Sequence, residues 1–269
     1  MKKVGFIGAG NMAGALIRGL LRAGRYKVGD LYVSDVVEGQ VRRLKRQHKI
    51  DGTRDNRQLV RESQTIILAV KPQSMASVLE EIRPEVTPRK LFISIAAGFP
   101  LRRLEAGLGG QARVVRVMPN APALVGRGVS VAVTGSHATD ADLKQTLKLF
   151  KAVGEAIAIT GEDLLDTVTA VSGSGPAFVY YFAECLMEGG VRGGLAQNLA
   201  TLLAHATLSG AAAMLSESGM SARELREMVT SPGGTTLAGL GALETHHFRE
   251  AVIAAIDAAT RRARELAVS

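Results

Sequence analysis

Residues 2–21 read KKVGFIGAGNMAGALIRGLL, and this stretch decides the fold. A short apolar run ends at Ile7, the turn Gly8-Ala9-Gly10 follows, and an amphipathic run then continues to Leu21. A strand, a glycine turn and a helix in this order are what a dinucleotide-binding unit requires. Gly8 permits the tight turn, and Gly10 leaves backbone N–H groups open to a pyrophosphate at the positive end of the helix. A glycine turn with a purely structural role would have the same sequence pattern, but the place of the motif after an N-terminal strand favours the dinucleotide site.

The composition indicates a protein with two modest domains. The chain has 269 residues, of which 46% are hydrophobic and none is Trp, so its cores must consist of aliphatic side chains and alanine. The single cysteine, Cys185, excludes an intrachain disulfide and a cysteine-based metal cluster, and a reducing cytoplasm is the simplest location. We expect no window apolar enough to span a bilayer and no signal peptide, because Lys2 and Lys3 lead directly into a strand.

The formal net charge of +8 raises the question of a nucleic-acid partner. The basic residues are spread along the chain, however, and only residues 42–46 form a dense cluster. With aromatic residues at 4% and no recognisable nucleic-acid module, we expect no nucleic-acid binding. The positive charge can instead attract anionic small molecules.

Apolar runs predict a parallel sheet in the first part of the chain. We expect strands at residues 31–33, 65–70, 91–95, 114–118, 129–133 and 156–159. Their alternation with helical segments predicts an α/β fold, an N-terminal Rossmann-type doubly wound sheet over residues 1–161. Helical periodicity then continues over residues 162–269, which we interpret as an all-α C-terminal domain. Its helices are so rich in alanine that a second copy is needed to complete the core, so we predict a dimerisation domain and a homodimer or larger homo-oligomer.

Two residues after the second predicted strand bear on the choice of cofactor. Asp35 lies about 20 residues beyond the glycine turn, where an acidic residue often binds the adenosine ribose of NAD. Ser34 could instead donate to the 2′-phosphate of NADP. A third interpretation is that either residue only caps the helix that begins near Val36.

Two stretches rich in glycine and hydroxyl groups interrupt the helical half, and we expect both to be loops. Residues 171–177 read VSGSGPA, and residues 230–236 read TSPGGTT. Each would present backbone N–H groups and hydroxyls at a helix N-terminus, which suits a carboxylate. Each could equally be a simple connection between helices.

Taken together, these motifs resemble those of the pyrroline-5-carboxylate reductase family, which catalyses the last step of proline synthesis. The resemblance extends from one end of the chain to the other, and the motifs occur in the family's order. No motif is specific by itself, but the set is. The motifs are GFIGAGNMA at 5–13, VKPQ at 70–73, SIAAG at 94–98, MPNAPA at 118–123, VSGSGPA at 171–177 and MVTSPGGTT at 228–236.

The resemblance implies a Rossmann domain, a helical domain that interleaves with that of a partner subunit, and NADPH as cofactor, with NADH possible. Many family members carry an arginine directly after the Ser34 position, which favours NADPH; here Asp35 and Val36 follow, and Arg57 could supply the missing charge. The implied cofactor-binding residues are Gly8, Ala9, Gly10, Asn11, Met12, Ser34, Asn56, Ala69, Val70, Lys71, Pro72, Ala96, Ala97 and Asn120. The implied substrate-binding residues are Ser172, Ser231, Gly233, Gly234, Thr235 and Thr236.

The expected reaction is hydride transfer from the nicotinamide to the cyclic imine of 1-pyrroline-5-carboxylate, which gives L-proline. Thr236 is the candidate catalytic residue, as a hydrogen-bond donor to the imine nitrogen. The spacing of His205, His246 and His247 predicts no metal site, and we expect structural or surface roles for them. Lys71, next to a proline at a strand end, is expected to lie beside the cofactor rather than to act as a base.

Two alternatives remain open at this point. A hydroxyacid dehydrogenase of the same architecture would carry a catalytic lysine on the helix after residues 172–177, and that helix offers Tyr180, Tyr181 and Glu184 instead. A non-catalytic NAD(P)-binding sensor would need the glycine turn but not the hydroxyl-rich stretch at residues 230–236.

Overall fold

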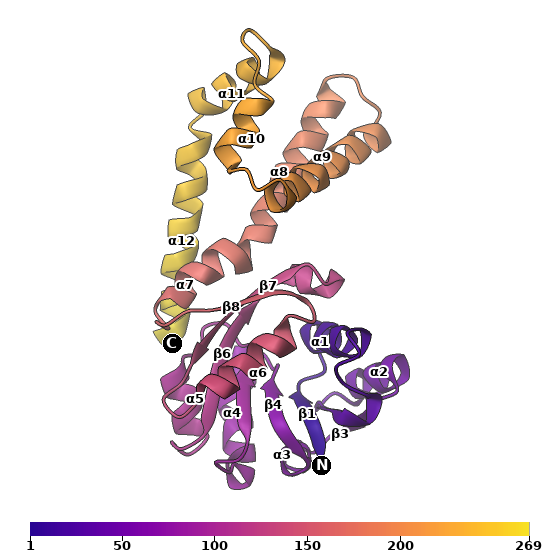
Figure 1. Cartoon of the computed structure of the whole chain (residues 1–269), viewed down its shortest axis with the longest axis vertical. Coiled ribbons are helices and arrows are strands. Elements are labelled where there is room, and N and C mark those ends of the chain that lie inside the picture. The colour runs from indigo at the N-terminus through magenta and orange to yellow at the C-terminus, as the bar shows by residue number, and fades with distance from the viewer. Residues whose placement is uncertain (269) are drawn as a thin grey trace. The chain divides into compact units, whose positions relative to one another are not determined.

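The computed structural model describes residues 1–268, and their secondary structure follows the predicted change from an α/β half to a helical half (Figure 1). Contacts divide the chain into two compact units. The first comprises residues 1–174 together with residues 259–268, and the second comprises residues 175–258. The domain boundary predicted at residue 161 stays a prediction.

The first unit contains one sheet of eight strands in the order β3-β2-β1-β4-β5-β6-β7-β8. The strands are β1 (Lys2–Ile7), β2 (Leu31–Ser34), β3 (Asp51–Thr53), β4 (Ser63–Leu68), β5 (Leu91–Ser94), β6 (Arg113–Pro119), β7 (Gly128–Thr134) and β8 (Gly154–Ala158). In the parallel part, Ile7 is in register with Ser34 and with Leu68, and Leu68 with Ser94. The carboxyl ends of four strands therefore meet along one edge, where ligands of doubly wound sheets bind.

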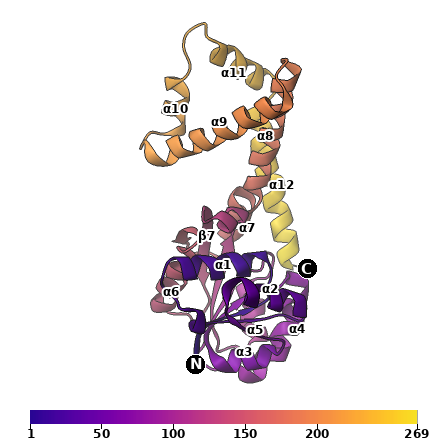
Figure 2. The ribbon, with the colours of Figure 1, turned by 90° about the vertical axis from the view of Figure 1, so that its right-hand side faces the viewer.

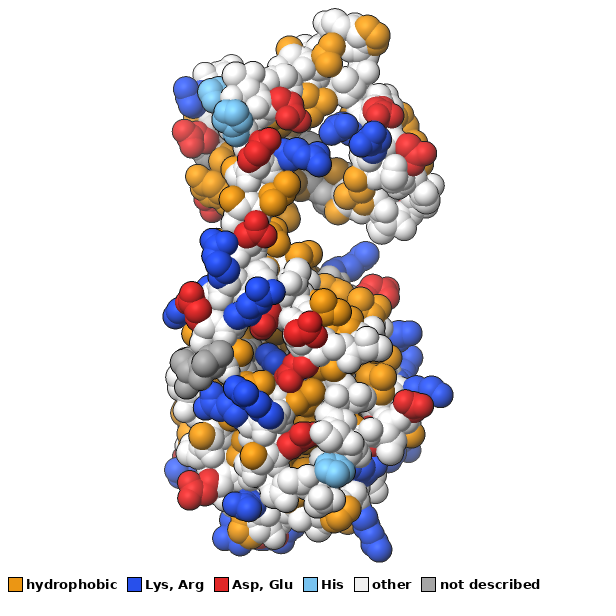
Figure 3. Space-filling model, turned by 90° about the vertical axis from the view of Figure 1, so that its left-hand side faces the viewer, with side chains coloured by type: hydrophobic (Ala, Val, Ile, Leu, Met, Phe, Trp, Pro, Cys, Tyr) orange, Lys and Arg blue, Asp and Glu red, His pale blue; other side chains and the backbone are white. Residues whose placement is uncertain are grey.

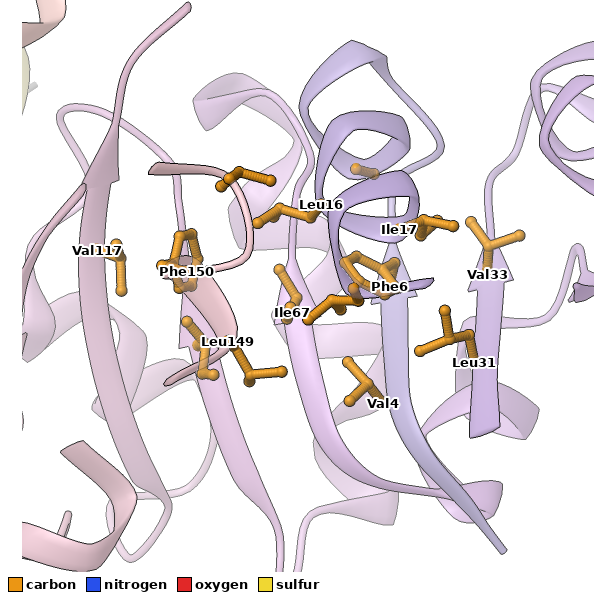
Figure 4. Close-up of a cluster of buried hydrophobic side chains, with 14 of the residues drawn as sticks. Val4, Phe6, Leu16, Ile17, Leu31, Val33, Ile67, Val117, Leu149 and Phe150 are labelled. Atoms are coloured by element: carbon orange, nitrogen blue, oxygen red, sulfur yellow. The ribbon is translucent and has the colours of Figure 1, made fainter. Parts of the chain in front are cut away.

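Helices cover both faces of this sheet (Figure 2). Helices α1, α2 and α6 bury their apolar side chains on one face, together with Phe6, Ile67 and Val117 of the strands (Figure 4). Helices α3, α4 and α5 cover the other face. The bounds are α1 (Asn11–Arg22), α2 (Glu38–His48), α3 (Asn56–Glu62), α4 (Pro72–Ile82), α5 (Leu101–Gly107) and α6 (Asp140–Phe150), with short 3-10 turns η1 (Val28–Asp30), η2 (Arg83–Glu85) and η3 (Ala121–Val125).

Two features of the sheet were not predicted. Strand β3 has three residues without an apolar run, so the sequence carries no strand signal there. Strand β7 runs antiparallel to β6, because the connection between them holds only the short turn η3 and no crossover helix.

The expected loop at residues 171–177 is wrong. These residues belong to a continuous helical run of α7 (Leu164–Val168), the π-helical segment η4 (Thr169–Ser174) and α8 (Gly175–Arg192). The hydroxyl of Ser172 donates to the carbonyl of Val168 at 2.8 Å, and that of Thr169 donates to the carbonyl of Leu165 at 2.7 Å. Both hydroxyls are therefore hydrogen-bonded to the backbone of their own helical run. A widened π turn accommodates residues that fit poorly in a regular helix, and such turns are frequent at functional sites.

The second unit is helical throughout. It contains most of α8, then α9 (Gln197–Glu217), α10 (Ala222–Met228), α11 (Thr235–Thr245) and the first part of α12 (Phe248–Val268). Within residues 175–258 only three residues are buried, and all are alanines: Ala183, Ala200 and Ala204. Large apolar side chains are exposed instead, as the orange atoms of the helices in Figure 3 illustrate.

Helix α9 corrects the expectation that no window is apolar enough to span a bilayer. Within its 21 residues, an 18-residue window has a mean hydropathy of 1.4 and 11% of that window is buried, so the helix meets the criteria of length and composition. The same two properties are expected of an alanine-rich helix that packs against another subunit. The exposed Leu199, Leu202 and Leu203 recur at helical spacing along this helix, so they share one face.

Candidate dinucleotide and carboxylate sites

The glycine turn between β1 and α1 has the geometry that a pyrophosphate requires. Gly8 has a φ of +103°, and a Cβ there would lie 2.5 Å from the carbonyl oxygen of Ala69. Gly10 is the N-cap of α1, and no side chain caps this helix. A Cβ on Gly10 would meet no atom within 4 Å, so this position faces open space. The backbone N–H groups at the start of α1 can therefore bind an anionic group.

A cleft of about 620 Å³ extends from this turn across the carboxyl edge of the sheet. It is bounded by the ends of β1, β2 and β4 and by one face of α4. This volume and its mixed apolar and polar lining suit part of a dinucleotide. The lining residues are Ile7, Gly8, Gly10, Asp35, Val36, Val37, Gln40, Asn56, Ala69, Val70, Lys71, Ser74, Ser77, Val78 and Glu81.

Asp35 is attached to the glycine turn. Its Oδ2 accepts the N–H of Ala9 at 2.8 Å, and its Oδ1 accepts the N–H of Val37 at 2.8 Å. It does not cap α2, whose N-cap is Val37 and carries no side-chain cap. The carboxylate is thus fixed at the cleft wall by two backbone donors.

Ser34 lies behind the cleft rather than in it. Its side chain is fully buried, and its hydroxyl donates to Oδ1 of Asn56 at 2.7 Å. The Nδ2 of Asn56 donates in turn to Oε2 of Glu81 at 2.8 Å. This chain of hydrogen bonds sets the amide orientation of Asn56 and places its second N–H as the free donor.

The two basic residues considered for this cleft, Arg57 and Lys71, differ in their availability to a ligand. Arg57 pairs with Glu85, with an Nη2–Oε1 distance of 3.0 Å. Lys71 lines the cleft directly before α4, and Pro72 is the first residue of that helix, where its missing N–H costs nothing.

Three further cofactor candidates, Ala96, Ala97 and Asn120, also lie in the first unit. Their side chains differ in whether they are free to contact a ligand. Ala96 and Ala97 follow β5, and Ala96 is buried. Asn120 uses its amide within the protein: Nδ2 donates to the carbonyl of Ser172 at 3.0 Å, and Oδ1 accepts the N–H of Val129 at 2.9 Å. Asn120 therefore connects the β6–β7 turn to the π-helical segment.

The second stretch of candidate residues lies in the second unit, at the start of α11. Gly233 has a φ of +70°, and the N–H of Gly234 donates to the carbonyl of Ser231 at 3.1 Å, which closes a tight turn. Gly234 is the N-cap of α11 without a side-chain cap, and Thr235 and Thr236 form its exposed first turn. A second free helix N-terminus thus lies next to the hydroxyls of two threonines, a combination that suits a carboxylate.

The sequence analysis missed Val37 and Gln40 at the start of α2, and it missed a set of four cleft residues on α4: Ser74, Ser77, Val78 and Glu81. They follow one another at helical spacing on a single face of α4. That period, which begins just after the VKPQ motif at a strand end, is the signal that could have identified them. Among residues 1–268, no cluster of three or more His, Cys, Asp or Glu is arranged to hold a metal ion.

Comparison with known proteins supports the two-part organisation. Residues 162–266 match the family model of the pyrroline-5-carboxylate reductase dimerisation domain, and residues 3–98 match that of coenzyme F420-dependent NADP oxidoreductases. A pyrroline-5-carboxylate reductase of Methanosarcina acetivorans is 45% identical over 98% of both chains. The chain belongs to the pyrroline-5-carboxylate reductase family.

Solved structures of pyrroline-5-carboxylate reductases have the same fold. The enzyme from Coxiella burnetii is 35% identical with a TM-score of 0.93 over 98% of both chains. The enzyme from Plasmodium falciparum, determined with NADP bound, is 33% identical with a TM-score of 0.88 over 99% of this chain and 98% of its own. For a chain of the pyrroline-5-carboxylate reductase family, the cleft at the glycine turn and the free N-terminus of α11 are the two candidate ligand sites.

Proposed function

We propose that this protein is a pyrroline-5-carboxylate reductase that reduces 1-pyrroline-5-carboxylate to L-proline with NADPH or NADH. The similarity over the full length to reductases of this name carries the proposal. The reaction adds a hydride to C5 of the cyclic imine and a proton to its nitrogen. The bound nicotinamide cofactor supplies the hydride.

The protein contributes orientation to this reaction. The start of α1 and the glycine turn would hold the pyrophosphate, with Lys71 as the adjacent cation. The start of α11, with Ser231 and the backbone of Gly233 and Gly234, would hold the substrate carboxylate. A protonated imine accepts a hydride readily, so fixing the carboxylate and the ring contributes more than a strong acid would.

Thr236 is the proposed donor to the imine nitrogen. Its hydroxyl is exposed on the first turn of α11 and makes no hydrogen bond within residues 1–268, so it is available to a ligand. Ser172 is a weaker candidate for the substrate site, because its hydroxyl already donates to Val168.

The helical residues 162–269 would form the substrate-binding and dimerisation domain, and residues 1–161 the dinucleotide-binding domain. The family match to a dimerisation domain and the exposed apolar side chains of α9 and α12 support a homodimer or a larger homo-oligomer. We propose a cytoplasmic enzyme with no nucleic-acid and no membrane partner.

The test of the activity is the absorbance of the reduced nicotinamide at 340 nm after addition of 1-pyrroline-5-carboxylate, with proline identified as the product. Rapid decay with either nucleotide is expected. A protein that binds the nucleotide but consumes none would contradict the proposal and favour the sensor alternative.

The Thr236→Val variant separates the enzyme from the sensor. We expect nucleotide affinity to stay unchanged and turnover to fall by about 10²-fold, the usual contribution of a positioned proton donor. Thr245→Val is the matched control, because Thr245 ends the same helix and its hydroxyl donates only to Gly241. Equal turnover in both variants would exclude the role given to Thr236.

A further inference from the structure

We propose that the amino edge of the sheet carries a second ligand site, which takes a small metabolite with two or more phosphate groups. Two neighbouring cavities form the site, and both are lined by Gln145 of α6. They lie at the end of the strands opposite to the nucleotide cleft, where the chain begins (Figure 1). The site does not depend on the proposed function, because none of its lining residues borders the nucleotide cleft.

The first cavity lies where three strands begin. The pairing of Thr65 with Leu91, and of Leu91 with Arg113, places the starts of β4, β5 and β6 side by side. A cavity of about 550 Å³ opens there, and Asp142 and Gln145 of α6 complete its lining. This volume is sufficient for a small metabolite. The six residues of β4 separate the cavity from the nucleotide cleft by about 20 Å.

The lining of the first cavity carries an excess of positive charge. Arg89, Lys90 and Arg113 contribute three cations, and Asp142 is the one carboxylate among the described lining residues. Oδ1 of Asp142 accepts a hydrogen bond from Arg113 at 2.8 Å, and Oδ2 accepts both the N–H and the hydroxyl of Thr139. Since this carboxylate is satisfied within the protein, the remaining charge of the lining favours an anion.

Several donors of this lining have no partner within the protein. Lys90 is not one of them, because its buried amine donates to three backbone carbonyls and so contributes only its charge. Arg89 is exposed, and its guanidinium makes no hydrogen bond or ion pair within residues 1–268. Oγ of Ser63 and Nε of Arg113 are buried and also lack a partner there, although buried polar atoms are normally paired. The lining therefore has hydrogen-bonding capacity that the protein does not use.

The second cavity, of about 400 Å³, extends the positive charge along α6. Its lining residues are Arg25, Tyr26, Lys144, Gln145 and Lys148, and none of these described residues is acidic. The amines of Lys144 and Lys148 make no hydrogen bond or ion pair within residues 1–268. Asp30, whose charge acts on Tyr26, is itself paired with Lys3 at 3.3 Å. The charge of this cavity is therefore not neutralised by the protein.

The two cavities together fit a ligand with several negative charges. Six cations line them, against one carboxylate among the described lining residues that is already paired. Each phosphate group carries a charge near −2, and its oxygens accept hydrogen bonds from guanidinium and amine groups. A ligand with two or more phosphates can use both cavities, whereas a single carboxylate would leave most of the cations without a partner.

Calorimetric titration with inorganic tripolyphosphate tests the inference. The full-length protein is first saturated with NADPH, which fills the glycine turn, and the ionic strength is held constant. We expect tripolyphosphate to bind this protein at one equivalent per chain, and orthophosphate to bind at least about tenfold more weakly. Arg89→Gln and Lys148→Gln should each weaken tripolyphosphate about tenfold, because each removes a charged donor. Both residues are exposed, so the melting temperature without ligand should stay unchanged.

Arg46→Gln is the matched control. Arg46 is also exposed, but it lines a separate basic depression beside α2, so its loss should change the affinity for tripolyphosphate less than about twofold. Three results would overturn the inference: no binding of tripolyphosphate to the NADPH-saturated wild type, unchanged affinity in both Arg89→Gln and Lys148→Gln, or an equal loss of affinity in Arg46→Gln. None of these measurements requires turnover of the imine, so they stand apart from the test of the proposed activity.

Discussion

At the scale of single residues, the two glycines of the first turn have different tasks. Gly8 is required by the backbone, since its φ is positive and an added Cβ would collide with the carbonyl of Ala69. Gly10 has an ordinary φ of −72° and open space around it. Gly8 is therefore needed for the backbone turn, whereas Gly10 is needed to leave space for a ligand.

Substitution by alanine should separate these tasks. Gly8→Ala places a Cβ against backbone at a strained φ, and we expect a loss of about 1–3 kcal/mol in the free energy of unfolding. Gly10→Ala should leave stability within about 0.5 kcal/mol but weaken nucleotide binding about tenfold, because the methyl group enters the cleft. Urea denaturation and fluorescence titration measure the two effects. A Gly10→Ala protein with wild-type affinity would contradict a pyrophosphate at this turn.

His48, at the end of α2, predicts a pH dependence of stability. Burial, followed by the charges of Arg18 and Arg43, lowers the pKa of His48 below 6.5. At pH values between its folded and unfolded pKa, the unfolded chain binds more protons than the native protein, so stability falls as the pH drops below 6.5.

The His48→Gln variant should lose part of this dependence. We expect its free energy of unfolding to decrease less between pH 7.5 and 5 than that of the wild type, measured by urea denaturation at each pH. Parallel curves for the two proteins would show that His48 does not contribute.

At the scale of elements, one partly buried ion pair joins three segments of the first unit. Arg116 of β6 is buried, and its guanidinium donates to Glu162 at 2.6 Å. The same carboxylate oxygen accepts the N–H of Leu101, at the start of α5, at 2.7 Å. Glu162 therefore connects a strand and a helix to the segment that follows β8.

Removing Glu162 should destabilise the first unit. Glu162→Ala removes the hydrogen-bonded partner of Arg116 and leaves it only the electrostatic attraction of Asp166, so we expect a loss of about 2 kcal/mol in the free energy of unfolding by urea denaturation. Glu155→Ala, on the exposed surface of β8, should cost less than about 0.5 kcal/mol. Similar losses in both variants would mean that the pair contributes nothing beyond a surface charge.

The sequence analysis identified the strands that carry an apolar run, because burial on both faces of a parallel sheet leaves a continuous hydrophobic signal. It could not identify β3, whose three residues have no such run, or the direction of β7, which depends on a connection too short for a crossover helix. It interpreted residues 171–177 as a loop, because glycine, serine and proline signal a break whether the chain turns or continues through a π turn. Local composition does not distinguish these outcomes.

For the site, the sequence analysis located the glycine turn, Asp35 and Asn56 near the cofactor, and the structure shows that all three border one cleft. It did not reveal that the hydroxyl of Ser34 donates its hydrogen bond to Asn56, since a hydrogen bond between residues far apart in the chain depends on the sheet register. The assignments of Thr236 and of the carboxylate site stay predictions.

At the scale of the whole molecule, the helical unit lacks a large-residue core of its own. Among residues 175–258 only alanines are buried, while Leu199 is 43% exposed and Leu202 63% exposed. The apolar surface on α9 is what an obligate interface between subunits requires.

A charge on this surface should break the assembly. We expect Leu202→Glu to shift the protein from a dimer or larger oligomer towards the monomer in sedimentation velocity, with a loss of turnover if the interface supports the substrate site. Val125→Glu, which is 74% exposed on η3, is the control with the same change. An unchanged sedimentation coefficient for Leu202→Glu would place the interface elsewhere.

The last ten described residues of α12 return to the first unit, where Leu266 approaches the turn at Gly98 and both Thr260 and Ala263 are buried. In topological terms the helical unit is an insertion, entered after Ser174 and left before Ala259. A fragment that stops at Ser174 is therefore an incomplete nucleotide-binding unit, and removing the last turns of α12 would change the packing beside the turn that follows β5, a segment far from α12 in the sequence.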